Sequence, residues 1–174
     1  MVSTCKFRIV TLPTATQSLP VTVEQRMLQA FVQFNKDWIT RYFKLEVSDM
    51  HYLSQPKRFI IDAGGYLFIA LYNNKSVGCC ALIYHAEAQK WELAKMAVSP
   101  QTQGHGAGWQ LGQTALNKAW QLGADEVFLE ANTRLEASVH LYYKLGFEAV
   151  DDYTLVYDRC NLYMVCKKTK NIHS

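Results

Sequence analysis

The segment at residues 103–109 reads Gln103-Gly104-His105-Gly106-Ala107-Gly108-Trp109, in a chain of 174 residues that has only nine glycines. Four of those nine lie between residues 104 and 112. Glycine lets the backbone take up positive φ and approach a ligand closely. An apolar strand pattern precedes the segment and a helical pattern follows it, and a helix N-terminus offers free N–H groups to phosphate. The pattern predicts a phosphate-binding loop, and the alternative is a tight turn without a ligand.

Two common phosphate-binding motifs do not fit this loop. A P-loop requires Gly-x-x-x-x-Gly-Lys-Ser/Thr, but Trp109 stands five residues after Gly104 and no Gly-Lys pair follows. A dinucleotide-binding loop requires Gly-x-Gly-x-x-Gly. Its last position holds Trp109 or Leu111, depending on whether the motif starts at Gly104 or Gly106. Both of these ligand classes are therefore excluded for the loop.

Upstream of the loop, the periodicity predicts one strand, two helices and an antiparallel meander. A strand is expected over 6–12, followed by a helix that begins at a capping box formed by residues 22–25. A second helix is expected to begin at Ser48-Asp49 and to stop at Pro56. Short turns join the strands of the meander, which are expected over 66–72, 77–85 and 91–98.

Downstream of the loop, helices and strands alternate. The helix after the loop carries an apolar stripe and should end at Gly123, and a strand follows over 127–131. Residues 133–136 form a second capping box and predict a helix that ends at Gly146. Strands at 147–150 and 162–166 complete the sheet. This order predicts an α/β (α+β) domain in which helices flank a mixed, mostly antiparallel central sheet.

The composition predicts one soluble domain over residues 1–174, because no linker or repeat is visible. Hydrophobic residues make up 49% and charged residues 19%, which excludes a disordered or collagen-like chain. The net charge of +3 is too small to indicate nucleic acid, and the basic tail at 167–174 is interpreted as a solvated end. No stretch resembles a membrane span or signal peptide, so we expect a cytoplasmic protein without a membrane or nucleic-acid partner.

The five cysteines indicate neither a zinc site nor a disulfide framework, because their number is odd and no C-x-x-C occurs. Reduced thiols and no bound metal are expected. Cys79 and Cys80 precede His85 on one predicted strand, which raises covalent cysteine catalysis as an alternative. Both cysteines stand within an apolar run, and we interpret them as small hydrophobic side chains.

Three ordered motifs resemble the Gcn5-related N-acetyltransferase (GNAT) superfamily, and together they span residues 91–147. Gln103, Gly106 and Gly108 match the family's pyrophosphate loop, Gln/Arg-x-x-Gly-x-Gly, and residues 92–100 resemble the strand that leads into it. Residues 141–147, LYYKLGF, resemble the family's LY-x-K-x-GF segment. Residues 129–135, LEANTRL, are similar to a subgroup whose fifth strand ends in Asn-x-Arg-Leu. The resemblance implies a GNAT fold and transfer of an acetyl group from acetyl-CoA to a primary amine in a ternary complex.

The resemblance assigns two catalytic roles. Glu92 would be the general base that takes a proton from the acceptor ammonium, directly or through water, because only the free amine attacks. The alternative for Glu92 is an exposed strand carboxylate, or one paired to Lys95 or Arg134. Tyr142 would be the general acid that protonates the departing thiolate, since a phenol has a pKa near 10; the alternative is simple packing. The adjacent Tyr143 is interpreted as packing.

The resemblance also implies how the cofactor is held. The backbone of Met96 and Val98 would pair with the pantetheine arm as a missing strand does. Asn132 would bond the same arm, and Lys144 could reach the 3′-phosphate. His105 either adds charge to phosphate binding or is simply exposed. The full set of expected cofactor-binding residues is Met96, Val98, Gln103, Gly104, His105, Gly106, Ala107, Gly108, Asn132 and Tyr142.

The acceptor is expected to be an amine on a small molecule or a peptide. Six aromatic residues could line its cleft or instead be core or dimer contacts: Phe34, Trp38, Tyr42, Phe43, Tyr153 and Tyr157. Four acidic residues could favour a cationic amine: Asp37, Glu46, Asp151 and Asp152. A function of a different class is a non-catalytic acyl-CoA-binding sensor or interaction module. A homodimer would be usual for the family, but no motif specifies an interface.

Overall fold

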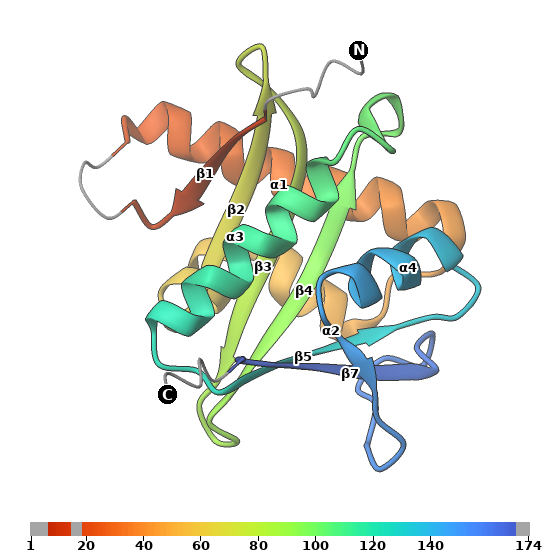
Figure 1. The fold of residues 1–174 in the computed structure, drawn as a ribbon. Coiled ribbons are helices and arrows are strands. Elements are labelled where there is room, and N and C mark those ends of the chain that lie inside the picture. Colours follow the sequence, from red (N-terminus) through yellow and green to blue (C-terminus); the bar gives the residue numbers. More distant parts are fainter. Residues whose placement is uncertain (1–6, 15–18, 170–174) are drawn as a thin grey trace.

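One twisted sheet of seven strands forms the centre of the protein and has helices on both faces (Figure 1). The computed structural model describes residues 7–14 and 19–169. The strands are β1 (Arg8–Leu12), β2 (Tyr66–Tyr72), β3 (Lys75–His85), β4 (Lys90–Val98), β5 (Glu126–Ala131), β6 (Glu148–Ala149) and β7 (Leu162–Lys167). Their order across the sheet is β1-β2-β3-β4-β5-β7-β6, and every pairing is antiparallel except β4 with β5. The predicted mixed, mostly antiparallel sheet is therefore confirmed.

The helices divide between the two faces of the sheet (Figure 1). One face packs against α1 (Val21–Tyr42), α2 (Val47–Ser54) and a short π-helical turn, η1 (Lys57–Ile61). The other face packs against α3 (Ala107–Gln121) and α4 (Glu136–Lys144), and a 3₁₀ turn, η2 (Pro100–Thr102), precedes the glycine loop. None of the residues of α4 is buried. None of the helices in the described part of the chain is long and apolar enough to cross a membrane.

The central strands are apolar on both faces because helices cover both. On β2, Phe68 joins the core under α3, whereas Ile69 joins the core under α1. The two adjacent cysteines of β3 divide in the same way, with Cys80 on the α3 side and Cys79 on the α1 side. Both are fully buried, and burial raises the pKa of the Cys79 thiol to about 12. These thiols are protonated at neutral pH, so neither is poised as a nucleophile.

Both predicted capping boxes are wrong. Helix α1 begins at Val21, one residue before the proposed cap Thr22, and the Pro20 carbonyl accepts the N–H groups of the first turn. Helix α4 begins at Glu136 without a side-chain cap. The Thr133 hydroxyl is instead held by the Asn161 side chain at 2.9 Å, so it is not available to the helix. In both places a tertiary or backbone partner replaced the local bond that the sequence pattern suggests.

A true capping box begins α2, but it uses a residue that the sequence interpretation did not choose. Glu46 is the N-cap, and its own N–H donates to the Asp49 carboxylate at 3.0 Å. The predicted start at Ser48-Asp49 is therefore one residue too late, because the helix begins at Val47. The consequence is that Glu46 and Asp49 are fixed next to each other at the start of this helix.

An irregularity in β4 reverses the alternation of its side chains. Lys95 has φ of +54°, and the pairing with β3 shifts at this point. Ala94 and Ala97 consequently both pack in the core under α1, whereas Met96 and Val98 pack toward α3. Regular alternation along a strand would place Glu92, Ala94, Met96 and Val98 on one face, and this irregularity separates them. The strand presents Glu92 to one side of the sheet and Met96 to the other.

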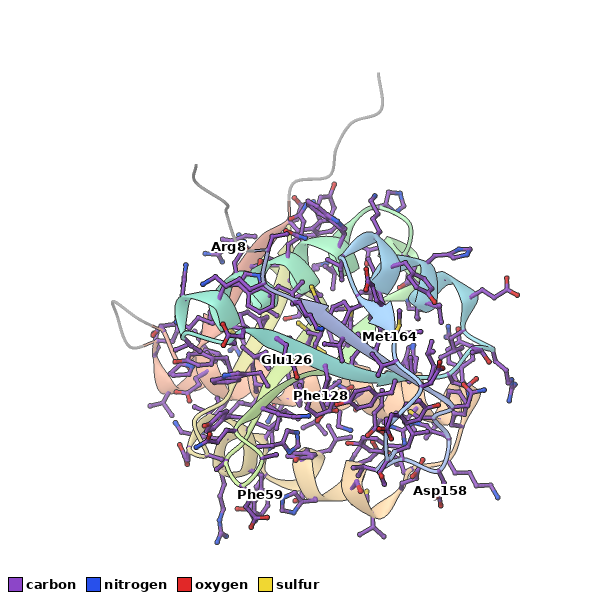
Figure 2. All side chains as sticks on the ribbon, turned by 60° about the horizontal axis from the view of Figure 1, so that its bottom comes forward. Arg8, Phe59, Glu126, Phe128, Asp158 and Met164 are labelled. Carbon is purple, nitrogen blue, oxygen red and sulfur yellow. The ribbon has the colours of Figure 1, made fainter. Side chains whose placement is uncertain are left out.

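Strands β4 and β5 separate soon after they meet. Their parallel pairing is limited to Trp91 with Val127 and Glu92 with Phe128. Beyond these pairs β4 continues to Val98 without a neighbour on that side, while β5 turns across the lower part of the sheet toward β7 (Figure 1). Figure 2 brings this end forward and shows Phe128 and Met164 on the neighbouring strands β5 and β7. The site described below lies where β4 and β5 diverge.

Some predictions concern the chain ends. Residue 6, at the start of the first predicted strand, lies outside the described residues, as do residues 170–174 of the basic tail. Lys168 is exposed, as expected for a solvated end, and its ammonium contacts the Trp120 carbonyl at 3.3 Å.

Candidate active site

Two adjoining pockets lie at the point where β4 and β5 separate. The inner pocket is bounded by α1, β4, β5 and the segment before β7, and Glu92, Glu130 and Tyr157 are among its lining residues. The outer cleft runs along the end of β4, the glycine loop and α4. The residues that line both are Trp38, Met96, Leu135, Ser138 and Tyr142. Because these residues are shared, the two pockets lie next to each other.

The glycine loop forms one wall of the outer cleft. Gly104 has φ of +78° and Gly106 has φ of +91°, and a Cβ on either would meet nothing within 4 Å. Glycine is therefore required at both positions by the backbone conformation rather than by lack of space. At Gly108 the reason is different, because a Cβ there would lie 3.0 Å from Leu141 Cδ2. The small residue lets α3 and α4 approach each other beside the cleft.

The loop is suited to bind an anion. Helix α3 begins at Ala107, so the N–H groups of its first turn have no acceptor within the helix. The dipole of the helix adds partial positive charge at the same place. The Gln103 side chain donates to the Val98 carbonyl at 3.2 Å and thereby ties the loop to the end of β4. The residues present thus fit the pyrophosphate of a coenzyme.

Most of the predicted cofactor-binding residues line the outer cleft. These residues are Met96, Val98, Gln103, Gly104, Gly106, Ala107, Gly108 and Tyr142. His105 is exposed outside the lining, and its ring contacts the Gln103 carbonyl at 3.0 Å. Lys144 lines the cleft and lies 5.9 Å from the centre of the Trp109 ring. The backbone of β4 beyond Glu92 remains an open strand edge, as the expected pairing with a pantetheine arm requires.

Asn132 lies in the inner pocket rather than in the outer cleft. Its side-chain amide donates to the Arg159 carbonyl, and its oxygen accepts the N–H of Arg134 at 2.8 Å. Both ends of the amide are therefore engaged within the chain, where they close the turn after β5. Its contact with a pantetheine arm stays a prediction.

Glu92 is buried in the inner pocket, with only 5% of its surface exposed. One carboxylate oxygen, Oε2, lies 2.7 Å from Nε2 of His85. It is thus neither an exposed strand carboxylate nor paired to Lys95 or Arg134, and both sequence-based alternatives are wrong. Burial among aromatic side chains with a single ring nitrogen as partner leaves the group able to accept a proton in the pocket.

Tyr142 stands at the junction of the two pockets. It lines both of them from α4, and its ring packs edge-on against Phe147 at 6.2 Å between centres. Burial raises the pKa of its phenol well above the ordinary value of 10.0, and the nearby Cys160 and Cys80 act in the same direction. The hydroxyl is therefore protonated at neutral pH and can serve as a donor. The neighbouring Tyr143 is 51% exposed, so its interpretation as a packing residue is wrong.

The predicted aromatic lining of the acceptor site is partly present. Trp38, Phe43 and Tyr157 line the inner pocket, and Tyr42 lines the outer cleft. The remaining two predicted residues, Phe34 and Tyr153, line neither. Of the four acidic residues proposed to attract a cationic amine, none lines either pocket: Asp37, Glu46, Asp151 and Asp152.

A buried ionic network supports the floor of the inner pocket, and the sequence analysis missed it. The fully buried Asp49 carboxylate accepts from Lys95 Nζ at 2.7 Å and from Arg159 at 2.6 and 2.9 Å. Although burial opposes its ionisation, the bonds from Arg159 and Lys95 hold the pKa of Asp49 below its ordinary value. Burial lowers the pKa of Lys95, whose ammonium also contacts the Tyr157 hydroxyl at 2.8 Å.

Two carboxylates hold the segment that carries Tyr157 and Arg159. Glu130 accepts the N–H groups of Val156 and Tyr157 at 2.9 to 3.1 Å. Glu46 accepts the next two N–H groups, those of Asp158 and Arg159, at 2.8 and 3.2 Å. Figure 2 shows Asp158 at the edge of the molecule, on the side of the N-terminal helices. No sequence motif indicates this arrangement, because its members come from three distant parts of the chain.

A comparison with protein families identifies the fold and its class of chemistry. Residues 31–147 match the model of the acetyltransferase (GNAT) family. The chain belongs to this family. The match covers the glycine loop, Glu92 and Tyr142. Members of this family are acyl-CoA-dependent acyltransferases, and the resemblance inferred from the three sequence motifs is confirmed.

Individual relatives agree with the assignment. N-alpha-acetyltransferase 30 of Schizosaccharomyces pombe is 25% identical over 118 residues, covering 66% of this GNAT chain and 78% of the relative. An acetyltransferase of the GNAT family from Staphylococcus aureus Mu50 has the same fold, with a TM-score of 0.75 and 16% identity over 92% of this chain and 99% of that one. An acetyltransferase of Bacillus subtilis, solved in complex with CoA, has a TM-score of 0.61 and 19% identity over 94% of this chain and 100% of that one.

The candidate site of this GNAT protein shows no metal-binding arrangement. Within residues 7–14 and 19–169, no group of three or more His, Cys, Asp or Glu side chains is placed to hold a metal ion. Glu92, which lines the inner pocket, is paired with His85.

Proposed function

We propose that this protein is an N-acetyltransferase that transfers an acetyl group from acetyl-CoA to a primary amine by direct attack in a ternary complex. The observation that carries the proposal is the junction of two pockets at Tyr142. One pocket holds a buried carboxylate, Glu92, and the other is walled by an anion-binding loop. A donor and an acceptor that each fill one pocket would meet beside the phenol.

In this proposal the outer cleft holds acetyl-CoA. The N–H groups of the loop from Gly104 to Gly108 bind the pyrophosphate, and the open edge of β4 at Met96 and Val98 aligns the pantetheine arm. The bound thioester supplies the activated acetyl group. The Bacillus subtilis neighbour solved with CoA supports this choice of ligand, since it shares the fold over nearly the whole chain.

Glu92 acts in the inner pocket as the base. An amine is mostly protonated at neutral pH, and only its neutral form has the lone pair that attacks the thioester carbonyl. The carboxylate accepts one proton from the ammonium, directly or through a water molecule. Because Glu92 is buried and its Oε2 is hydrogen-bonded to His85, its position is fixed while the proton arrives.

Tyr142 acts at the junction as the acid. The phenol is protonated at neutral pH, so a proton is available for the sulfur when the carbon–sulfur bond breaks. The fact that Tyr142 lines both pockets supports a role for it between the amine and the thioester. In a partly buried cleft the departing thiol is a more stable product than the thiolate, because little water is present to stabilise the negative charge.

The acceptor is proposed to be a cationic amine on a small molecule or a peptide. The Schizosaccharomyces pombe relative is by name an N-alpha-acetyltransferase, which supports an amine acceptor. The inner pocket offers the aromatic walls of Trp38, Phe43 and Tyr157 and the carboxylates of Glu92 and Glu130. Its cations, Lys95 and Arg159, are balanced by the carboxylates of Asp49 and Glu46. This lining favours an ammonium group over an anion.

The first experiment measures the thermal stability of the purified protein with acetyl-CoA, CoA, NAD or ATP. A ligand that binds only the folded state adds about 2.7 kcal/mol at a hundredfold over its Kd. Stabilisation by acetyl-CoA and CoA, without stabilisation by NAD, is expected. Failure of both coenzymes to stabilise the protein would remove the basis for the assigned cleft.

The second experiment screens amines and N-terminal peptides for release of free thiol from acetyl-CoA, with mass spectrometry of the product. Glu92→Gln should lower kcat on the order of 100-fold, because a positioned base contributes roughly 100- to 10,000-fold. The variant should still bind CoA, since Glu92 lies outside the outer cleft. Binding of acetyl-CoA without turnover on any acceptor would instead support a non-catalytic acyl-CoA sensor.

A further inference from the structure

His85 and Glu92 form a pair across the β3–β4 hairpin. The Cα partner of Glu92 is Ile83, so His85, two residues further along β3, lies on the same face of the sheet as Glu92. Its Nε2 is 2.7 Å from Glu92 Oε2. At this distance the ring N–H donates a charge-assisted hydrogen bond to the carboxylate.

The two side chains differ in their access to water. Glu92 has 7% of its side chain exposed and lines the inner pocket, whereas His85 has 32% exposed and does not line the pocket. The imidazole therefore connects a buried carboxylate to solvent from outside the pocket. If the partner of Glu92 only held it in place, its side chain would not need to titrate near neutral pH, as an imidazole does.

The proposed reaction releases one proton for each acceptor consumed. An ammonium and a thioester give an amide, a thiol and one proton. The nitrogen loses two protons: Glu92 accepts the first, and the second restores the phenol of Tyr142 after its own proton has gone to the sulfur. When coenzyme and acceptor fill the two pockets, the base has no open route to bulk water through them. The released proton must leave by another path.

We propose that His85 is a positioning residue that fixes the Glu92 carboxylate and releases its own proton to solvent as Glu92 accepts one from the acceptor. The Nε2–H stays bonded to Oε2 throughout. The proton that leaves is the one on Nδ1 of the imidazolium, and water takes it up. One proton enters the pair from the ammonium and one departs, so the total charge of the pair is unchanged. This inference rests on the proposed role of Glu92 as the base.

The surroundings of the pair favour this exchange. The bond to Glu92 raises the pKa of His85, burial opposes the rise, and Glu130 on β5 adds to it. Lys90, the cross-strand partner of His85, is exposed, and the Phe128 ring lies 5.6 Å away between centres. The titratable groups that act on or respond to Glu92 from the other packed elements are Tyr52, Lys95, Glu130, Tyr157, Cys160 and Tyr163.

The proposed exchange between His85 and Glu92 determines the direction in which kcat changes with pH. While His85 is charged, the pair takes up the acceptor proton only as the Nδ1 proton leaves, and a low pH opposes that loss. As the pH rises, the Nδ1 proton leaves more readily and the transfer to Glu92 is favoured. With both substrates saturating, kcat should therefore rise with pH through the pKa of His85, which lies above the ordinary value of 6.5.

The test compares His85→Gln, His85→Leu and the control His51→Gln between about pH 5.5 and about pH 9. His51 is an exposed histidine on α2 that stacks on Phe59 at 4.1 Å, so it controls for the loss of an imidazole. The amide of His85→Gln keeps an N–H donor but does not titrate. We expect this variant to lose the acidic limb of the kcat profile near neutral pH, and His51→Gln to keep it. His85→Leu should lower kcat about 10- to 100-fold, because the bond to a charged group is lost.

A second readout does not depend on activity. The ring of His85 is titrated by NMR in the wild type and in Glu92→Gln, and its midpoint should fall in the variant. An unchanged midpoint, or a wild-type kcat profile in His85→Gln, would overturn the inference even if the enzyme is active and Glu92→Gln is not. If no amine is acetylated by the wild type, the proposed function fails first. Unchanged CoA binding in all variants shows that they are folded.

Discussion

Glu92 on β4 and Tyr142 on α4 come from different elements but line the same inner pocket, at the point where β4 and β5 separate. Tyr142 alone of the two also lines the outer cleft. The proposed base therefore faces only the acceptor, whereas the proposed acid faces both substrates. This arrangement separates the two proton transfers in space and makes each residue testable by itself.

Tyr142→Phe removes the hydroxyl and keeps the ring. We expect kcat to fall by roughly 10- to 100-fold, because the departing sulfur loses its proton donor, while the Kd for CoA changes less than about threefold. Steady-state kinetics and isothermal titration calorimetry measure the two quantities. Tyr143→Phe is the matched control, since that neighbour is exposed and should leave both unchanged. Equal turnover of the two variants at every pH would contradict the role of Tyr142.

Gly106→Val should strongly weaken CoA binding, and Gly64→Val separates this effect from backbone strain. The two glycines have similar φ, +91° and +94°, and a Cβ on either meets nothing within 4 Å. Both variants should lose about 1–2 kcal/mol of unfolding free energy, because an L-residue is disfavoured at positive φ. Only Gly106→Val should weaken CoA binding, on the order of 100-fold, since it crowds the loop N–H groups. Equal CoA affinity of the two variants would refute the assignment of the loop.

Asp49→Asn should be among the most destabilising polar substitutions in the chain. Asp49 is fully buried, and its removal leaves the charges of Lys95 and Arg159 without their shared partner. Loss of one member of a buried ion pair costs about 3–5 kcal/mol, which urea denaturation would measure. Asp151→Asn, at an exposed position, should cost less than about 0.5 kcal/mol. If the two variants unfold at the same urea concentration, the network does not stabilise the fold.

The pair of His85 and Glu92 should make stability depend on pH in a defined direction. The pKa of His85 is raised in the folded protein, so its contribution is fully present below the ordinary value of 6.5 and is lost as pH rises through the folded pKa. The difference in unfolding free energy between wild type and His85→Gln should be under about 1 kcal/mol, because the ring is partly exposed. It should shrink from pH 6 to pH 9, to about zero. A difference that grows with pH would reverse the assigned sign.

Much of the fold could be predicted because local patterns determine it. The bounds of β2 at Tyr66–Tyr72 follow from an apolar run, and the ends of α3 and α4, two residues before Gly123 and Gly146, follow from glycines with positive φ. The glycine loop was recognisable for the same reason, since its backbone conformation requires particular residues in a particular order. The site residues that belong to such motifs, Gly106 and Tyr142 among them, were therefore accessible from the sequence.

The parts that could not be predicted depend on tertiary partners. Alternation fails at Lys95, because a positive φ at a lysine has no sequence signature, and the reversed face of Met96 follows from it. The predicted cap at Thr133 fails because Asn161, distant in sequence, binds its hydroxyl. Asp49 and Arg159 are 110 residues apart in the sequence, so neither carries a local sign of the pairing.

Helix α4 contains none of the buried residues that anchor the other long helices, yet Ser138, Leu141 and Tyr142 on it line the site. An element with little buried surface opens locally at a low cost in free energy. Its amide hydrogens should exchange with solvent faster than those of α3 in the free protein and slow down when coenzyme occupies the cleft. The order of α4 is thus linked to occupancy, and the helix that presents the proposed acid becomes most rigid only when a substrate is present.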